Sequence, residues 1–220
     1  AERALEEALK QAKLQREDID AMVTTGYGRT AITDGDKSIT EITCHARGAH
    51  FLNPEVRTVI DIGGQDTKII CVEQGFVKDF MMNDKCSAGT GRFLEIMANT
   101  LSMRPNEMCE LAREGSGVTI SSMCTVFAES EVISLIGQGE KKENIAFAVV
   151  DSIVRKVAAQ ANRMSEDRPM LCLTGGLCEC SYISEALTKE LGMEVKTDPQ
   201  SRYAGAIGAA LGAVKKGKKN

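Results

Sequence analysis

The stretch RTVIDIGGQDTKIICVEQGFVKDFMMND, residues 57–84, predicts the centre of the fold. Its first part, 57–62, reads as a buried strand with Asp61 near its end, followed by a Gly-Gly turn and two strands joined at Gly75. Glycines at such a turn let backbone N–H groups approach a phosphate closely. Asp61 is suited to holding Mg²⁺ through water beside nucleotide phosphates. An isolated motif of this kind is more often a plain β-turn with a solvated aspartate, so that alternative stays open.

A second stretch repeats this arrangement farther along the chain. MLCLTGGL, residues 170–177, reads as a buried strand that runs into Gly175 and Gly176 before a helix. Two such turns on separate strands indicate a nucleotide held between them. Because the chain contains no G-x-x-x-x-G-K-[ST] motif, the expected nucleotide site is not a P-loop.

Strands alternate with helices along the rest of the chain, which is typical of an α/β protein. Short strands are expected within 21–29 and 193–197. The expected helices are 2–14, 38–52, 90–101, 105–113, 125–138, 143–164, 181–191 and 203–214. The helix over 143–164 carries an apolar stripe at every fourth residue, which should face the core: Ile145, Val149, Ile153, Val157 and Ala161. Small residues in 45–51 and 203–209 would let two helices cross closely, as plain packing or as a hinge between two lobes.

Composition excludes several classes of function. The net charge of −4 gives no sign of a nucleic-acid surface, and no apolar run reaches membrane length. Since no signal-peptide pattern opens the chain, we expect a cytoplasmic protein, in which eight cysteines favour metal binding or redox chemistry over disulfides. Two histidines are too few for a histidine-rich zinc site. Because the chain starts at Ala1, directly on a helical pattern, we expect that a preceding segment is missing.

Two cysteines precede predicted helices. Cys86 lies in MNDKCSAGTGRFLEIM, residues 82–97, and Cys124 lies in SSMCTVFAESEVISLI, residues 121–136. A helix N-terminus exposes N–H groups and partial positive charge, which lowers the pKa of a thiol and favours a bound anion. The pattern therefore indicates either reactive thiols or thiolate ligands of a metal cluster.

The chain resembles the activator ATPases of 2-hydroxyacyl-CoA dehydratases, which are related to the ATPase subunits of benzoyl-CoA reductase. The matching stretches run in family order from TGYGR through GDKSITEITCHARG, VIDIGGQDTK, NDKCSAGTGRFLE and CTVFAESEVIS to TGG and YAGAIGAAL. The resemblance implies the actin-like, sugar-kinase-like ATPase fold with duplicated ribonuclease H-like lobes. Residues 1–56 would be part of the first lobe, 57–201 the second lobe, and 202–220 a C-terminal helix packed back on the first.

The resemblance also implies cofactors and partners. Cys86 and Cys124 would bind one [4Fe-4S] cluster per homodimer, each chain supplying two ligands. ATP turnover with Mg²⁺, yielding ADP, would drive a low-potential electron from the cluster to a 2-hydroxyacyl-CoA dehydratase or a benzoyl-CoA reductase-type partner. Ferredoxin or flavodoxin would be the electron donor.

The same resemblance assigns the nucleotide site. The second phosphate loop would contain the residues Asp61, Gly63, Gly64, Gln65 and Asp66. Gly175 and Gly176 would form the adenosine turn, and either Gln65 or Asp66 would orient the attacking water. The family's first phosphate loop, D-x-G-S-T-x-x-K, is absent from the sequence, so impaired ATP hydrolysis is expected.

Three points stay open at this stage. Cys178 and Cys180 form a C-x-C pair beside the adenosine turn, which is more often incidental than metal-binding. A small-molecule kinase of the same fold, such as an amino-sugar kinase, would explain both glycine turns but leaves Cys86 and Cys124 without a role. An iron–sulfur sensing dimer would use the cysteines without ATP-driven electron transfer.

Overall fold

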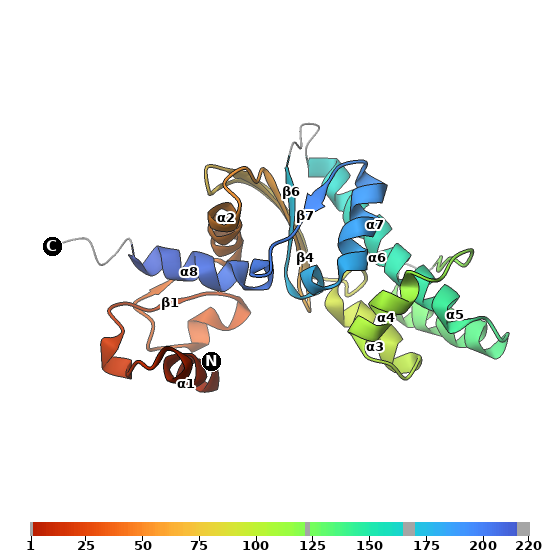
Figure 1. Ribbon diagram of the computed structural model, residues 1–220, viewed down its shortest axis with the longest axis horizontal. Helices are drawn as coiled ribbons and strands as arrows, with labels where there is room; N and C mark the ends of the chain where they lie inside the picture. The colour runs from red at the N-terminus through yellow and green to blue at the C-terminus, as the bar shows by residue number, and fades with distance from the viewer. Residues whose placement is uncertain (1, 122–123, 165–169, 215–220) are drawn as a thin grey trace.

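A five-stranded mixed sheet forms the centre of the computed structural model, which describes residues 2–121, 124–164 and 170–214 (Figure 1). Its strand order is β5-β4-β3-β6-β7. The strands are β3 (Thr58–Ile62), β4 (Thr67–Glu73), β5 (Phe76–Asn83), β6 (Leu171–Thr174) and β7 (Val195–Lys196). β3 pairs antiparallel with β4 and parallel with β6, so the predicted hairpin and the second predicted strand meet at the middle of one sheet.

Helices cover both faces of this sheet. The α-helices are α1 (Glu2–Ala12), α2 (Glu41–Leu52), α3 (Gly91–Thr100), α4 (Pro105–Ala112), α5 (Thr125–Gly137), α6 (Lys142–Met164), α7 (Ser181–Leu191) and α8 (Ala204–Val214). Short 3₁₀ helices are η1 (Arg16–Asp18), η2 (Tyr27–Ala31), η3 (Gly176–Glu179) and η4 (Ser201–Tyr203), and β1 (Val23–Thr24) pairs parallel with β2 (Lys37–Ser38). α2 and α8 lie on one side of the large sheet, and α6 and α7 on the other (Figure 1).

The main core lies between the sheet and α6. All five residues of β3 are buried, which suits a strand with helices on both faces. The predicted stripe on α6 is confirmed, because its five residues from Ile145 to Ala161 are fully buried in this core. Every fourth residue of an α-helix returns to nearly the same face, so the stripe fixes which side of α6 contacts the sheet.

The two small-residue segments are the contact between α2 and α8. A Cβ on Gly48 would lie 1.9 Å from the carbonyl oxygen of Ala204, and a Cβ on Gly208 would lie 1.8 Å from that of Cys44. Neither position has room for a side chain, so the close helix crossing predicted from the sequence is confirmed. Its use as a hinge stays a prediction.

Two local predictions are wrong. The helix expected from residue 38 begins at Glu41, because Ser38 belongs to β2 and Thr40 caps the helix by accepting a hydrogen bond from the N–H of Thr43. Cys86 does not stand at a helix start, since the residue that precedes the first turn of α3 is Thr90. Cys124, in contrast, is the N-cap of α5 as expected.

The division into lobes stays a prediction. The last six residues of the predicted C-terminal segment, 215–220, lie outside the described part of the chain. α8 packs against α2 and β1, and its end at Val214 is the last described residue. None of the helices formed by the described residues has the length and apolar character needed to cross a lipid bilayer.

Candidate functional site

The two glycine turns lie next to each other at the ends of β3 and β6. The parallel register of these strands puts Asp61 opposite Thr174, and the Thr174 hydroxyl donates to Asp61 Oδ1 over 2.9 Å. Gly175 has a φ of +81°, and a Cβ there would lie 2.4 Å from the carbonyl oxygen of Ile62. A residue with a side chain would therefore separate the two turns, so glycine is required at this approach.

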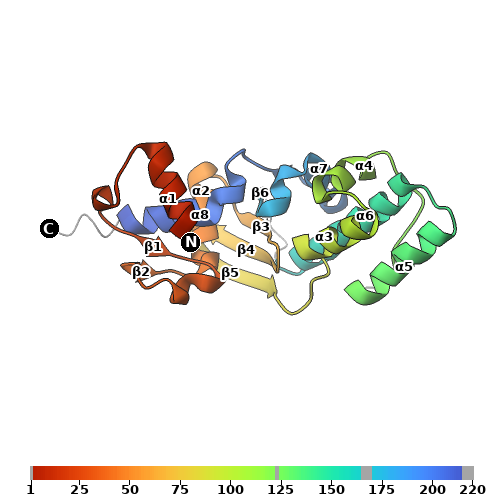
Figure 2. The same cartoon turned by 90° about the horizontal axis from the view of Figure 1, so that it is seen from below.

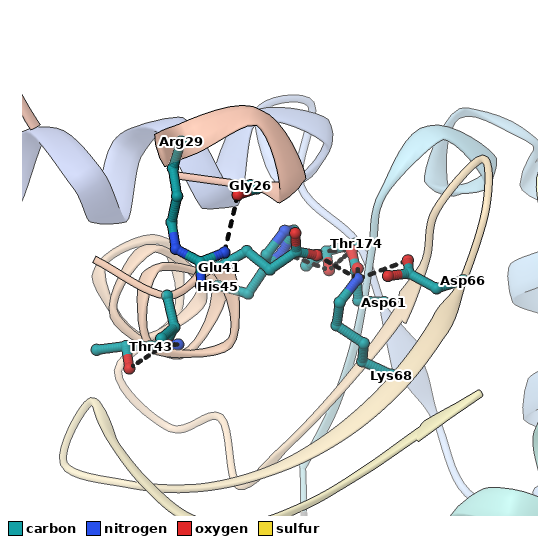
Figure 3. Close-up of polar contacts among 10 residues, drawn as sticks. Gly26, Arg29, Glu41, Thr43, His45, Asp61, Asp66, Lys68 and Thr174 are labelled. Carbon is teal, nitrogen blue, oxygen red and sulfur yellow. Dashed lines mark hydrogen bonds and ion pairs between the residues drawn. The ribbon is translucent and has the colours of Figure 1, made fainter. Parts of the chain in front are cut away.

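A buried lysine, Lys68, holds this edge of the sheet together. It lies on β4 with 1% of its surface exposed, and Figure 3 shows its ammonium facing carboxylates from three different segments. Its Nζ donates to Asp61 Oδ2 at 3.2 Å and to Asp66 Oδ1 at 2.6 Å, and it pairs with Glu41 Oε1 of α2 at 2.5 Å. The pairing joins β3, the loop before β4, and α2 through one side chain.

The electrostatics of Lys68 follow from these partners. Burial by itself lowers the pKa of Lys68, but the Asp61 carboxylate and the hydrogen bonds to Asp66 and Glu41 outweigh it and raise that pKa well above its ordinary value. Lys68 is therefore charged at neutral pH. One positive charge against three carboxylates leaves the cluster with two net negative charges when all are ionised.

This cluster offers ligand atoms for a divalent cation. Among the described residues, Glu41, His45 and Asp61 each contribute one atom, and these atoms lie within 4.8 Å of one another. His45 Nδ1 lies 3.3 Å from Asp61 Oδ1. Carboxylate oxygens suit Mg²⁺, and the excess of negative charge would disfavour nucleotide phosphates without a cation, so the residues fit a Mg²⁺–nucleotide site.

Sequence reasoning missed Glu41, His45 and Lys68. Glu41 and His45 come from a helix assigned to packing, and no spacing in the sequence links them to Asp61. Lys68 lies on β4 and follows Asp66, the last residue of the preceding loop, by two positions. In an extended chain residues two apart point to the same side, and this spacing is the signal that would have revealed the pairing. The alternative of a solvated aspartate in a plain turn is wrong, because Asp61 is 1% exposed.

The loop between β3 and β4 is bonded to the start of α3. The N–H of Gly91 donates to the carbonyl of Gly63, and the N–H of Arg92 donates to that of Gly64, each over 2.9 Å. These are the first two helical N–H groups, which have no partner within the helix. Since loop carbonyls accept them, they are not directed at a cluster, contrary to the expectation for the helix after Cys86.

Other members of this loop differ in exposure. Gln65 is exposed, whereas Asp66 is 3% exposed and paired with Lys68. Gly64 and Gly176 have open space where a Cβ would be, so both leave backbone accessible to a ligand. The side chain of Tyr27 in the TGYGR segment is mostly exposed but interacts with the Asp66 carboxylate, so this segment lies in the same region. Partial desolvation and that carboxylate raise the pKa of Tyr27.

The segments that carry Cys86 and Cys124 are joined directly. The hydroxyls of Ser87 and Thr125, each one residue after a cysteine, hydrogen-bond over 2.6 Å. The side-chain amide of Asn83 donates to the Cys86 carbonyl and fixes the loop from the other side. Cys86 is half-buried and Cys124 is exposed, so each of the two joined segments carries a cysteine that is at least partly accessible to solvent.

The remaining cysteines lie elsewhere. Cys178 and Cys180 are buried, and the Cys180 thiol is hydrogen-bonded with that of Cys109 of α4. This contact raises the pKa of Cys109 and lowers that of Cys180. Neither member of the C-x-C pair belongs to a group of three potential metal ligands within the described residues.

Comparison with known proteins decides the family. The model of the BadF/BadG/BcrA/BcrD ATPase family matches residues 1–213. The chain belongs to this family. Its relatives include the (R)-2-hydroxyglutaryl-CoA dehydratase activating ATPase of Acidaminococcus fermentans, 46% identical over 99% of this chain and 84% of the relative.

Solved structures of family members agree with the fold. Component A of the Acidaminococcus fermentans (R)-2-hydroxyglutaryl-CoA dehydratase superposes with a TM-score of 0.95 over 99% of this chain and 84% of that one, at 46% identity. The activator of the 2-hydroxyisocaproyl-CoA dehydratase from Clostridium difficile, solved with bound ADPNP, superposes with a TM-score of 0.94. The match covers 99% of this chain and 82% of that one, at 41% sequence identity. The predicted family and the predicted α/β, actin-like ATPase fold are therefore confirmed.

The predicted site residues fall into two groups. Asp61, Gly63, Gly64, Asp66 and Gly175 lie together around the ends of β3 and β6. Cys86 and Cys124 lie in the two segments that the hydrogen bond between Ser87 and Thr125 joins. Their roles as nucleotide and cluster ligands stay predictions and are taken up as a proposal.

Proposed function

We propose that this family ATPase is the ATP-dependent activator of a 2-hydroxyacyl-CoA dehydratase or of a benzoyl-CoA reductase-type enzyme. It would transfer one low-potential electron at a time from a [4Fe-4S] cluster to that partner, with ATP hydrolysis driving the transfer. The support from relatives is that the similar proteins are themselves dehydratase activators. Ferredoxin or flavodoxin would supply the electrons.

One structural observation carries the proposal: hydrogen bonds connect the glycine turn at 63–64 to both cysteine segments. The turn accepts from Gly91 and Arg92 of α3, and Thr67 Oγ1 donates to the carbonyl of Gly89 over 2.6 Å. From that loop, the bond between Ser87 and Thr125 continues to α5. A movement of the turn on nucleotide binding would therefore act on both cysteines without a long pathway.

At the nucleotide site, Asp61 would hold Mg²⁺ through water, with Glu41 and His45 close enough to contribute. Backbone at Gly63 and Gly64 would contact phosphate, and Gly175 and Gly176 would contact adenosine. Between the two candidates for orienting the attacking water, exposure favours Gln65, since the Asp66 carboxylate is engaged by Lys68. Phosphoryl transfer depends on such positioning and on neutralising charge.

At the cluster site, Cys86 and Cys124 would act as two thiolate ligands. A [4Fe-4S] cluster takes four, so a second copy related by two-fold symmetry would supply the others. Exposed apolar side chains follow Cys124 along α5 and would be covered in such a dimer: Val126, Phe127, Ile133 and Ile136. Figure 2 shows α5 at the opposite end of the molecule from α1, where a second copy would have access.

The chemistry of the donor set supports this cofactor. Two cysteines in joined segments, one of them exposed, provide soft ligands of the kind that iron–sulfur clusters require. The cluster would supply a reversible one-electron couple. The protein would provide the ligands, the symmetric contact and the connection to the nucleotide.

The test is anaerobic purification followed by iron and sulfide analysis of the wild type and of Cys86→Ser and Cys124→Ser. We expect about four iron atoms per dimer in the wild type and loss of iron and of dimer in both variants. Cys71→Ala, a change in β4, is the control and should keep its iron. A Cys86→Ser protein with wild-type iron content would contradict the assignment.

A second measurement separates the proposed activator from the two alternatives. ATP-dependent reduction of the dehydratase component by the dithionite-reduced protein is expected only for an electron-transfer activator. An iron-containing dimer that reduces no partner would favour the sensing dimer. An iron-free protein that phosphorylates a sugar would favour the kinase.

A further inference from the structure

The side chain of Lys156, on α6, contacts the sulfur of Cys86. Its Nζ donates to Cys86 Sγ over 3.7 Å, a hydrogen-bond distance for sulfur. Lys156 is half-buried on α6. The contact brings a positive charge to one of the two proposed cluster ligands.

The position of this ammonium group is fixed by the packing of its alkyl chain. A Cβ on Gly89 would lie 3.2 Å from Cδ and 3.3 Å from Cγ of Lys156, so the lysine stem lies directly over the glycine. Gly89 has a φ of +83°, in the left-handed region that favours glycine. A side chain at residue 89 would push the lysine away from the sulfur.

Lys156 differs from the neighbouring basic residues in what its side chain contacts. It lines a pocket of about 350 Å³ between the Ala88–Gly89 loop and α6, together with Arg155 and Arg163. Arg155 is exposed and paired with Asp151 over 2.5 Å. Arg163 is exposed and lies about two turns farther along α6. Of the three cations, Lys156 is the one with a hydrogen bond to a cysteine sulfur.

We propose that Lys156 is a positioning residue that raises the reduction potential of the cluster. The inference rests on the proposed function, because it requires Cys86 to be a ligand. Adding one electron makes the cluster more negative, and a cation that donates an N–H to a ligand sulfur stabilises that form more than the oxidised form. In a symmetric dimer, two copies of Lys156 act on one cluster.

The electron balance involves no further reactant. One electron from the reduced donor protein would pass through the cluster to the dehydratase, and Lys156 would keep its proton throughout. Its effect is on how readily the first step proceeds. Removing the charge would make the cluster harder to reduce and a stronger reductant once reduced.

The test is a redox titration of the anaerobic dimer, followed by electron paramagnetic resonance, for wild type and Lys156→Met. We expect the equilibrium constant for one-electron reduction to fall about tenfold, which corresponds to about 59 mV. Lys156→Arg keeps the charge and should retain a potential close to that of the wild type. Arg155→Met removes one charge from the same pocket without a sulfur contact and should shift the potential much less.

The outcomes distinguish this inference from the proposed function. A wild-type protein without iron and sulfide would overturn the proposed function itself. A cluster with the same potential in wild type and Lys156→Met, or equal shifts in Lys156→Met and Arg155→Met, would overturn the role of Lys156 alone. Should the methionine variant not retain its iron, Lys156→Gln keeps a polar side chain without charge, and the same comparison applies.

Discussion

Replacing Lys68 by methionine should destabilise the protein more than any other single loss of charge in the described part of the sheet. Methionine matches the length of the lysine stem but removes the ammonium. Asp61, Asp66 and Glu41 would then face one another without a cation, and two of them, Asp61 and Asp66, are almost completely buried.

The magnitude follows from the cost of breaking a buried ion pair. Removing one partner of such a pair typically costs about 3–5 kcal/mol, because the other charge stays buried without compensation. For a chain of this length, each kcal/mol lowers Tm by about 2–4 °C, which predicts a decrease of about 6–20 °C. Three carboxylates share Lys68, so the upper half of this range is expected.

The pH dependence has a definite sign. The pKa of Lys68 is raised in the folded state, so its contribution to stability is complete below its unfolded pKa of about 10.4. That contribution is lost only as the pH rises through the still higher folded pKa. The stability difference between wild type and variant should therefore be constant between about pH 6 and pH 9.

The assay is urea unfolding with thermal unfolding as a second probe. Lys78→Met, which removes an exposed lysine of β5 in the same hairpin, is the matched control and should change stability by less than about 0.5 kcal/mol. Adding Mg²⁺ should stabilise Lys68→Met more than the wild type, because the freed carboxylates can bind it. Equal stability of Lys68→Met and Lys78→Met would refute the role given to the buried lysine.

Two further predictions concern the nucleotide site and the crossing of α2 with α8. Asp61→Asn should abolish ATP turnover while iron content stays at the wild-type level, and a variant that still hydrolyses ATP would point to another magnesium ligand. Gly208→Ala places a Cβ 1.8 Å from the Cys44 carbonyl oxygen and should cost about 3 kcal/mol or more by urea unfolding. Gly137→Ala has open space around the added Cβ and should not lower the free energy of unfolding. Similar losses of stability in the two variants would refute the packing argument.

Much of the fold could be predicted because its signals are local. The apolar period of α6 and the two Gly-Gly turns each depend on residues close in sequence, and both are present in the structure. The crossing of α2 and α8 was foreseeable from small residues, although only the structure identifies Gly48 and Gly208 as the positions without room.

The parts that sequence reasoning missed depend on contacts between distant segments. A lysine in a strand is normally expected at the surface, and only three carboxylates from separate segments explain why Lys68 is buried. The expectation that the first N–H groups of α3 face a cluster was wrong because they bond to the Gly63–Gly64 turn, a segment distant in the sequence. The bond between Ser87 and Thr125 spans 38 residues and has no sequence signal.

The central claim is that the nucleotide site controls a cluster held by Cys86 and Cys124. The direct measurement is the rate at which a chelator removes iron from the anaerobic dimer without nucleotide, with ADP, and with a slowly hydrolysed ATP analogue. The connection from the Gly63–Gly64 turn to both cysteine segments predicts the fastest removal with the ATP analogue and a smaller effect with ADP. Identical rates in all three states, with nucleotide binding confirmed, would contradict it.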